Sequence, residues 1–342
     1  MKAMVLRNVC DLRRNMSPLS YELVAEPEPG PDDLLLDVSV CGVCHTELDE
    51  IEGRTPPRTL PMILGHQVVG RVVARGAAAT RIEVGARVGV AWINSACGKC
   101  RQCLAGTENL CGEFVATGRD VNGGYAQQMV VPERFAHTIP ASLSDAHAAP
   151  LLCAGAIGYR SLRLSGAGNG KRLGLTGFGA SGHLVLAMAL RRFPFMEIYV
   201  FARNPEERAF ALELGAVWTG DTDARPPVAL DAIIDTTPAW KPVLKALEAL
   251  APGGRLVINA IRKEHGDREL LARLDYPAHL WLEKEIKSVA NVTRSDVREF
   301  LTLAADTGIL PEVREVPLED ANTAILDIKR GIGRGARVLR VA

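Results

Sequence analysis

The first 150 residues contain short apolar runs that are interrupted by glycine, proline and charged residues, and no long helical period appears among them. Short runs separated by turn residues are typical of β-strands in a small, barrel-like unit. We therefore expect a mostly β domain at the start of the chain. Its predicted strands include residues 34–40, 66–76, 86–92 and 123–131.

The pattern changes at about Leu151, where apolar runs begin to alternate with segments of helical period. This alternation favours βαβ units on a parallel sheet, with an α/β fold of the doubly wound class. The last of these helices is expected to end at the APGG stop signal, residues 251–254. The predicted strands are 172–177, 197–202, 230–237 and 254–260, and the predicted helices cover 179–193, 205–216 and the segment before Pro252.

Beyond these units, residues 285–292 predict one more strand and residues 295–308 one more helix. The chain then returns to short β-type pieces, 312–318 and 336–341, around a helical segment at 318–331. We expect this last part to rejoin the first domain. The predicted domains are residues 1–150, completed by 293–342, and residues 151–292.

The composition limits the kinds of molecule that the chain is expected to bind. The chain has 342 residues, 47% of them hydrophobic, with 40 Lys plus Arg against 40 Asp plus Glu. A balanced charge gives no overall attraction to nucleic acid or to an anionic membrane, so a small-molecule partner is expected. The first seven residues are too short an apolar run for a signal peptide, and no segment approaches a membrane span. A cytoplasmic location is expected by default.

Four of the eight cysteines stand close together, at Cys97, Cys100, Cys103 and Cys111. Two-residue gaps let the backbone turn while each sulfur points inward, so four thiolates can close a tetrahedron around a structural zinc ion. Two disulfides are the plain alternative. An iron–sulfur cluster is another, although such runs usually place proline after the fourth cysteine, where this chain has Gly112.

Chemistry would need a second metal site with an open position, and Cys44, His66 and Cys153 are the candidates for it. Two cysteines, one histidine and one labile position form the ligand set of the catalytic zinc in an alcohol dehydrogenase. Taken singly, each residue has another interpretation, because a buried cysteine usually acts as a small hydrophobe and a lone histidine is usually a satisfied polar group.

Gly177, Gly179 and Gly182 form a GxGxxG turn between a predicted strand and a predicted helix. Such glycines allow a tight turn, the approach of a pyrophosphate and close helix–strand packing. The helix N-terminus would then face the phosphates with its free N–H groups. Within the βαβ pattern, this motif predicts a site for a dinucleotide.

The end of the next strand indicates which dinucleotide is preferred. An acid usually binds the ribose hydroxyls of NAD about 20 residues after the glycines. Ala202 stands there, 20 positions after Gly182, and Arg203 and Asn204 follow it. Arg203 could pair with a 2′-phosphate, which favours NADP over NAD. The alternative is that Arg203 is a solvated loop charge and that NAD binds without its usual acid.

The order of these motifs (CGVCHTEL, GHQ, the CxxCxxCx7C lobe and PLLCAG before GxGxxG) resembles the zinc-dependent alcohol dehydrogenases of the medium-chain dehydrogenase/reductase superfamily. The segments GGYAQQMVV and LCAGAIGYRSL are similar to the microbial and cinnamyl-alcohol-dehydrogenase-like branch. The resemblance covers essentially the whole chain. It implies a GroES-like catalytic domain for 1–150 with 293–342, and a Rossmann domain for 151–292.

The resemblance also assigns roles to residues around the first cysteine pair. It implies that Cys44, and not Cys41, is the zinc ligand, and that Thr46 hydrogen-bonds the substrate oxygen and passes on its proton. Glu47 matches the acid that orients a zinc-ligating histidine. His45 matches a residue that can touch the cofactor pyrophosphate.

The resemblance also implies a wall of the substrate pocket, and the chain departs from the family pattern at two positions. Trp92 matches a wall of the substrate pocket. Gln67 follows His66 where the family often has glutamate, which puts in doubt any mechanism in which that carboxylate binds zinc. Asp49 replaces a histidine that often ends the proton relay, so the last acceptor could be Asp49, His45 or water.

The expected activity is reversible hydride transfer between primary alcohols or aldehydes, aliphatic or aromatic, and NADP(H), in a homodimer or homotetramer that carries two zinc ions per chain. One alternative is a zinc-independent quinone or enone reductase on the same fold, which would leave Cys44, His66 and Cys153 without a role. Another is a non-catalytic NADP-binding redox sensor, against which the pairing of Thr46 with Cys44 speaks.

Overall fold

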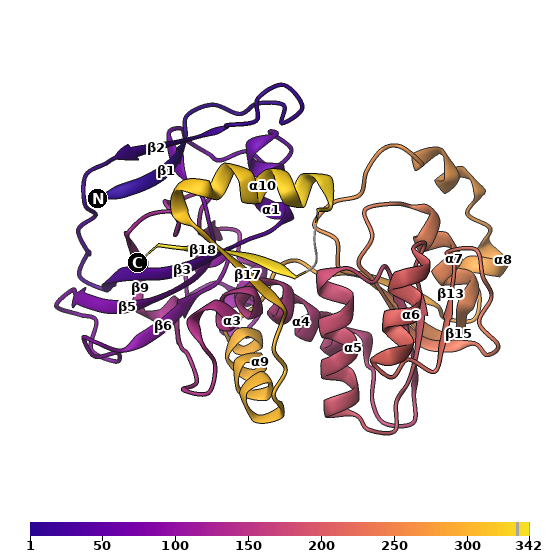
Figure 1. The fold of residues 1–342 in the computed structure, drawn as a ribbon. Coiled ribbons are helices and arrows are strands. Elements are labelled where there is room, and N and C mark those ends of the chain that lie inside the picture. Colours follow the sequence, from indigo (N-terminus) through magenta and orange to yellow (C-terminus); the bar gives the residue numbers. More distant parts are fainter. Residues whose placement is uncertain (333–334, 342) are drawn as a thin grey trace. The chain divides into compact units, whose positions relative to one another are not determined.

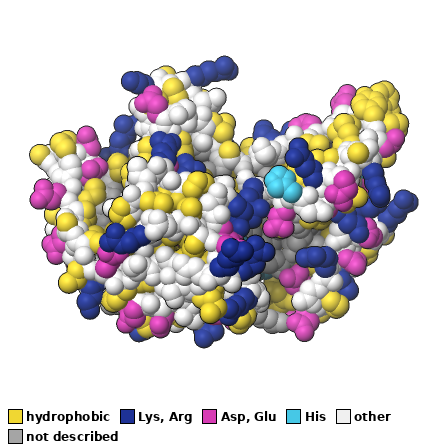
Figure 2. Space-filling model, turned by 90° about the horizontal axis from the view of Figure 1, so that it is seen from above, with side chains coloured by type: hydrophobic (Ala, Val, Ile, Leu, Met, Phe, Trp, Pro, Cys, Tyr) yellow, Lys and Arg dark blue, Asp and Glu magenta, His cyan; other side chains and the backbone are white. Residues whose placement is uncertain are grey.

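The computed structural model describes residues 1–332 and 335–341 (Figure 1). The chain divides into two compact units, Met1–Cys153 with Val292–Ala342, and Ala154–Asn291. We call them unit 1 and unit 2. No helix among the described residues is long and apolar enough to cross a membrane. Acidic and basic side chains are interspersed on the face that Figure 2 shows, in keeping with the balanced composition.

Unit 1 is built on a β-sheet that has seven strands within the described residues. The strand order is β10-β6-β5-β3-β18-β17, and β9 also pairs with β3. Pairing is antiparallel except between β17 and β18. The strands are β3 (Asp33–Val43), β5 (Gln67–Arg75), β6 (Arg87–Val90), β9 (Gln128–Pro132), β10 (Ala136–Thr138), β17 (Val313–Pro317) and β18 (Ala336–Arg340).

The longest strand, β3, places the start of the candidate site. Leu34, Leu36 and Val38 are buried at alternate positions, as expected for a strand with one face in the core. Its far end pairs with β18, where Leu339 lies opposite Cys41. The last segment of the chain is therefore a neighbour of the first long strand.

Smaller elements complete unit 1. The remaining strands are β1 (Lys2–Leu6), β2 (Leu19–Leu23), β4 (Met62–Ile63), β7 (Ile93–Ser95) and β8 (Val115–Ala116). The helices are α1 (His45–Ile51), α2 (Arg101–Leu104), α3 (Asp145–Pro150), α9 (Arg294–Thr307) and α10 (Ala321–Arg330), with 3-10 turns η1 (Glu108–Leu110), η2 (Glu133–Phe135) and η5 (Leu318–Asp320). A π-helical turn, η3 (Leu151–Gly155), carries Cys153.

Unit 2 is a parallel sheet with the order β13-β12-β11-β14-β15-β16, six strands among the described residues. This confirms the predicted doubly wound class. The strands are β11 (Arg172–Thr176), β12 (Glu197–Phe201), β13 (Trp218–Gly220), β14 (Leu230–Asp235), β15 (Leu250–Ile258) and β16 (Glu285–Ser288). The helices are α4 (Ala156–Ser165), α5 (Ala180–Arg192), α6 (Pro205–Glu213), α7 (Lys241–Ala249) and α8 (Tyr276–His279), with the 3-10 turn η4 (Arg268–Arg273).

Both faces of the central strands β11, β12 and β14 are buried, which explains their nearly continuous apolar runs. On one face, Tyr199, Phe201, Ile233 and Leu256 pack with apolar side chains of α7. Neighbouring strand residues such as Ile198 and Val200 are also buried, on the opposite side of the pleat. Because β11 pairs in parallel with both β12 and β14, the carboxyl ends of the three strands lie together at one edge of the sheet.

Three boundaries differ from the sequence-based expectation. The helix before Pro252 does end, at Ala249, but the APGG segment belongs to β15, where Gly253 has a φ of +69° and the register with β14 shifts. The predicted strand 123–131 is regular only from Gln128, where β9 (Gln128–Pro132) begins, and in 285–292 only Glu285–Ser288 is a strand. Asn291, with a φ of +59°, breaks the extended backbone there.

Candidate active site

The strand β3 runs directly into the short helix α1, and Cys44 stands at the junction as its N-cap. The Cys44 sulfur accepts a hydrogen bond from the backbone N–H of Thr46 at 3.4 Å. The Cys44 backbone N–H donates to Glu47 Oε2 at 2.8 Å, which closes a capping box. The cap fixes the backbone of Cys44, so that its side chain has a defined direction.

Cys44, His66 and Cys153 come together in unit 1, and their three ligand atoms lie within 4.8 Å of one another. The His66 Nε2 atom is 3.8 Å from Cys44 Sγ and 3.3 Å from Cys153 Sγ. Gly65 presents His66 with a φ of +95°, and a Cβ atom there would meet the Tyr125 ring at 2.4 Å. Two thiols and an imidazole nitrogen are a zinc donor set with room for a fourth ligand.

Glu47 determines which nitrogen of His66 is available to a metal. Its Oε1 lies 2.7 Å from His66 Nδ1, and both side chains are buried. A proton held on Nδ1 by this carboxylate leaves Nε2 as the free donor. Burial opposes a charged ring, yet the carboxylate of Glu47 and the thiol of Cys44 together raise the pKa of His66 well above its usual value. The hydrogen bond that the neutral Cys44 thiol donates to Cys153, together with burial, raises the pKa of Cys44.

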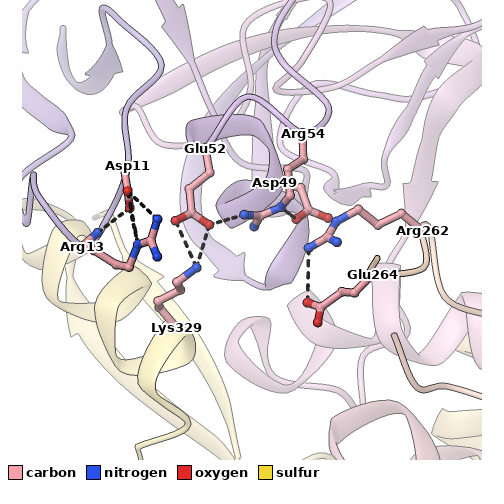
Figure 3. A network of polar contacts seen from close by, with 8 residues as sticks. All are labelled: Asp11, Arg13, Asp49, Glu52, Arg54, Arg262, Glu264 and Lys329. Carbon is pink, nitrogen blue, oxygen red and sulfur yellow. Dashed lines mark hydrogen bonds and ion pairs between the residues drawn. The ribbon is translucent and has the colours of Figure 1, made fainter. Parts of the chain in front are cut away.

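The expected relay residues lie on α1 next to this group. Thr46 is half-buried and lies two residues after Cys44, whereas His45, between them in the sequence, is exposed. Asp49 is buried, and its carboxylate accepts from Arg54 Nε at 2.5 Å. Arg54 also donates to Glu52, which pairs with Lys329 of α10 at 2.7 Å (Figure 3). Asp49 is therefore an ion-paired carboxylate and not an isolated base.

Glu50 is a buried acid that the sequence reasoning missed. Both of its oxygens have no hydrogen-bond partner in the described part of the chain, and the same holds for Trp92 Nε1, Tyr125 Oη and Gln67 Nε2. Burial and then the nearby Glu47 carboxylate raise the pKa of Glu50 well above its usual value. The available signal was its position, three residues after Glu47 on one face of a helix.

Trp92 lies between β6 and β7 and is packed on both sides. Its ring is 5.5 Å from that of Phe114, and the Arg119 guanidinium lies over it at 5.1 Å. Arg119 also pairs with the buried Asp120 at 2.8 Å. These contacts hold the indole ring in one orientation, which a pocket wall requires.

The four-cysteine lobe also lies in unit 1, and its sulfur atoms lie within 4.8 Å of one another. Cys97 and Cys103 are 3.9 Å apart, and Cys100 and Cys111 are 3.8 Å apart. A tetrahedron with metal–sulfur bonds of about 2.3 Å has sulfur–sulfur edges of about 3.8 Å. All four are free thiols at these distances, so the two-disulfide alternative does not describe this structure. Backbone N–H groups, first that of Lys99, lower the pKa of Cys97 to about 7.

A buried acid attaches this lobe to the rest of unit 1. Glu108 Oε1 accepts from both the backbone N–H and the Nε of Arg294, at 3.0 and 2.9 Å. Arg294 begins α9, and its guanidinium also lies 5.1 Å from the centre of the Phe135 ring. The lobe is thus fixed to a helix almost 200 residues further along the chain.

The glycine turn lies in unit 2, between β11 and α5. Gly177 has a φ of +81°, and a Cβ there would meet Thr236 Oγ1 at 2.7 Å. A Cβ at Gly182 would meet the Gly177 carbonyl oxygen at 2.7 Å. Nothing in the described structure lies within 4 Å of a Cβ built on Gly179, so a ligand that approaches the backbone would explain that glycine best.

At the end of β12 the three residues predicted to select the cofactor have different roles. Ala202 is buried, and Arg203 is exposed. Asn204 caps α6, because its Oδ1 accepts from the backbone N–H of Glu206 at 2.9 Å. Arg208, which the sequence reasoning missed, donates to the carbonyl oxygens of Ala202 and Arg203 at 2.8 and 2.9 Å. A cleft next to this edge is lined by Thr176, Gly177, Phe201, Thr222, Thr237 and Lys245.

Comparison with known proteins identifies the family. The Alcohol dehydrogenase GroES-like domain family matches residues 30–141. The chain is 43% identical over 329 residues to Probable alcohol dehydrogenase AdhA of Mycobacterium tuberculosis, covering 95% of this chain and 93% of that protein.

Two solved structures share the whole fold. A cinnamyl alcohol dehydrogenase from Sorghum bicolor matches with a TM-score of 0.84 and 27% identity, covering 99% of this chain and 97% of that one. A candidate zinc-binding dehydrogenase from Sinorhizobium meliloti 1021, bound to NADP, matches with a TM-score of 0.84 and 27% identity over 99% of both chains. The chain therefore belongs to the zinc-dependent alcohol dehydrogenases of the medium-chain dehydrogenase/reductase superfamily, with a GroES-like domain and a Rossmann domain.

Proposed function

We propose that this alcohol dehydrogenase transfers hydride reversibly between primary alcohols or aldehydes, aliphatic or aromatic, and NADP(H), with two zinc ions per chain. The observation that carries the proposal is the convergence of Cys44, His66 and Cys153, with their ligand atoms within 4.8 Å. These residues would hold the catalytic zinc, and the lobe of Cys97, Cys100, Cys103 and Cys111 would hold a structural one. When bound at the open site, zinc acts as a Lewis acid on the substrate oxygen.

The chain's own residues supply the positioning and the proton transfer. Glu47 holds His66 in the tautomer that presents Nε2. Thr46, whose backbone N–H donates to the Cys44 sulfur, would accept the hydroxyl proton of the alcohol and return it to the aldehyde during reduction. The ion pair between Arg54 and Asp49 favours His45 or water over Asp49 as the next acceptor, because Asp49 already satisfies a cation. Trp92 would bound the side chain of the substrate.

Two features support NADP(H) as the cofactor. The buried Ala202 offers no carboxylate to ribose hydroxyls, and the exposed Arg203 next to it offers a guanidinium to a 2′-phosphate. The relative from Sinorhizobium meliloti was solved with NADP. A charge-assisted contact of this kind contributes roughly 1.5 to 3 kcal/mol, which corresponds to about a 10- to 150-fold preference.

We also propose that the protein forms a homo-oligomer through the free edge of the unit 2 sheet. All four residues of β16 are exposed, and β16 pairs only with β15 within the described residues. Large apolar side chains are exposed close by in the sequence, at Tyr276, Trp281, Leu282 and Ile286. An open strand edge with apolar neighbours is a natural surface for a second copy. Light scattering of wild type and Ile286→Lys measures this directly, and a monomeric wild type would refute it.

The central experiment combines metal analysis of the purified chain with NADPH consumption against short aliphatic, benzylic and cinnamyl aldehydes. Two zinc ions per chain and turnover of at least one aldehyde class are expected. One zinc ion per chain with undiminished turnover would refute the assignment of the open site.

The cofactor preference is measured separately, as kcat/KM for NADPH and NADH at one ionic strength, because salt screens phosphate pairing. Arg203→Ala should weaken NADPH use and spare NADH. Ala202→Asp should move the preference further toward NADH, since a carboxylate accepts ribose hydroxyls and repels the phosphate. An unchanged cofactor ratio in Arg203→Ala would leave Arg203 as a solvated loop charge.

A further inference from the structure

A buried ion pair lies at the carboxyl edge of the unit 2 sheet. Asp235, the last residue of β14, is fully buried. Its Oδ1 accepts from Thr176 Oγ1 at 2.5 Å and from Thr237 Oγ1 at 2.8 Å. Its Oδ2 is paired with the ammonium of Lys263, whose side chain is only 7% exposed. The four side chains form one polar network inside an otherwise apolar sheet.

Lys263 is held by more than the carboxylate. Its ammonium also donates to the carbonyl oxygens of Thr237 at 2.8 Å and Ala239 at 3.1 Å, so each of its three protons has an acceptor. The segment around it is fastened independently, since the backbone N–H of Glu264 donates to the Pro238 carbonyl at 2.7 Å. Removal of the Lys263 charge therefore leaves the segment with other anchors.

A contribution to folding stability does not by itself explain the buried ion pair of Asp235 and Lys263. Replacement of a buried ion pair by apolar residues of similar volume is often neutral or stabilising, because both charges lose their hydration. The place of the pair suggests another reason. Thr176 immediately precedes Gly177, and Thr176 and Thr237 both line the cleft at the end of the strands. The Asp235 carboxylate thus lies just below the surface where, under the proposed function, the diphosphate of the cofactor binds.

A bare carboxylate at this place would repel an anionic ligand, since charges in a poorly hydrated interior interact over many ångströms. The carboxylate also orients two threonine hydroxyls of the turn. We propose that Lys263 is a positioning residue for the cofactor: its ammonium neutralises Asp235, so that the glycine turn keeps its threonine contacts and still accepts a diphosphate. This inference rests on the proposed function, because it takes the glycine turn as the dinucleotide site.

A charge-neutralising role of Lys263 and a purely structural role of the ion pair predict different effects of substitutions at Lys263 and at Asp235. If the network only holds the fold, then Lys263→Met and Asp235→Asn should both weaken ligand binding. If Lys263 acts by neutralisation, Lys263→Met exposes the ligand to a carboxylate, whereas Asp235→Asn leaves an additional cation and keeps an oxygen for the two threonines. Arg172→Met is the matched control, since it breaks a partly exposed ion pair with Glu197 at the start of the same sheet.

The measurement is the dissociation constant of the full-length variants for ADP-ribose, an anionic diphosphate, and for uncharged adenosine, at fixed pH and salt. Lys263→Met should weaken ADP-ribose binding by roughly tenfold or more and change adenosine binding little. Asp235→Asn should bind ADP-ribose at least as tightly as wild type, and the double variant Asp235→Asn/Lys263→Met should recover most of the loss. Arg172→Met should match wild type.

Several outcomes would overturn the inference. Equal weakening for ADP-ribose and adenosine, weaker ADP-ribose binding in Asp235→Asn, or no change in Lys263→Met would each do so. If Lys263→Met does not fold, the comparison of Asp235→Asn with wild type decides, because only neutralisation predicts undiminished binding. A wild type that binds neither ADP-ribose nor NADPH would instead refute the proposed dinucleotide site.

Discussion

The four-cysteine lobe and the site of Cys44, His66 and Cys153 share one unit and one kind of donor, but they are built differently. The lobe draws its ligands from 15 consecutive residues, 97–111, and three of its four cysteines are half-exposed. The second site joins residues 109 positions apart, from Cys44 to Cys153, and its two cysteines are partly exposed as well, but its histidine is buried. A site with four protein ligands can lie near the surface. A site with three protein ligands needs a buried, oriented histidine so that its open coordination position admits the substrate selectively.

The sharpest test of this difference is one serine substitution in each site. Cys153→Ser should leave a folded protein that still binds NADPH, while turnover falls by on the order of 10³ or more, because the Lewis acid loses a ligand. Cys103→Ser should instead lower stability, since a structural metal contributes folding free energy. Zinc content, cofactor binding and thermal unfolding are measured for both. Similar losses in all three quantities would remove the distinction between the sites.

The proposed proton relay concerns the open site alone. Thr46→Ala removes the hydroxyl and spares the ligands, so zinc and NADPH should bind while turnover falls by on the order of 10². Thr46→Ser, which keeps a hydroxyl, should retain most activity. Steady-state kinetics of both variants decide the matter, and equal losses would mean that packing explains the residue.

The attachment of the lobe to α9 should affect stability and not chemistry. Glu108→Ala removes two hydrogen bonds to Arg294 and should cost about 2 to 3 kcal/mol in the free energy of unfolding, with kcat unchanged. Glu113→Ala is the control, because this glutamate is exposed in the same lobe. Denaturant unfolding and steady-state rates are the measurements. A large fall in kcat without destabilisation would contradict the purely structural role of the lobe.

Low pH should destabilise unit 1 at His137, which lies near Arg294 and Arg298 of α9. Burial first, and then Arg298 and Arg294, lower the pKa of His137 to about 4. The unfolded chain, with a histidine pKa of about 6.5, binds the proton more readily, so stability should be lost as the pH falls from about 6.5 toward 4. The loss between pH 7 and 5 should be roughly 2 kcal/mol. His137→Gln should show a smaller loss in denaturant unfolding, and an identical loss would exclude this histidine.

The two sites also differ in how much of them the sequence could predict. The spacing of Cys97, Cys100, Cys103 and Cys111 is enough to predict a metal lobe, because its geometry is local. His66 and Cys153 gain meaning only through the family resemblance, since nothing in their local spacing brings them to Cys44. The glycine turn is intermediate in how well the sequence predicts it. Its motif is short, but within a βαβ pattern the motif specifies both the backbone of the turn and its neighbours.

Contacts across long separations were not predictable in either unit. Lys329 pairs with Glu52, and Arg294 anchors Glu108, yet a basic residue in a sequence gives no sign of its acceptor. Lys263 is a similar case, because a lysine is normally expected at the surface and not against a buried Asp235. The fold class follows from periodicity, whereas ion pairs depend on the relative placement of distant segments.

The pairing of β3 with β18 has a consequence for the order in which the protein matures on the ribosome. Residues 33–43 are synthesised almost 300 residues before their partner strand at 336–340, so the central sheet of unit 1 stays unfinished for most of translation. Unit 2 is continuous in sequence, and its strands find their neighbours soon after they emerge. During this interval the end of β3, residues 40–43, has an unpaired edge, the kind of nascent segment that chaperones bind. The synthesis of β18 therefore decides when the end of β3 is protected from aggregation.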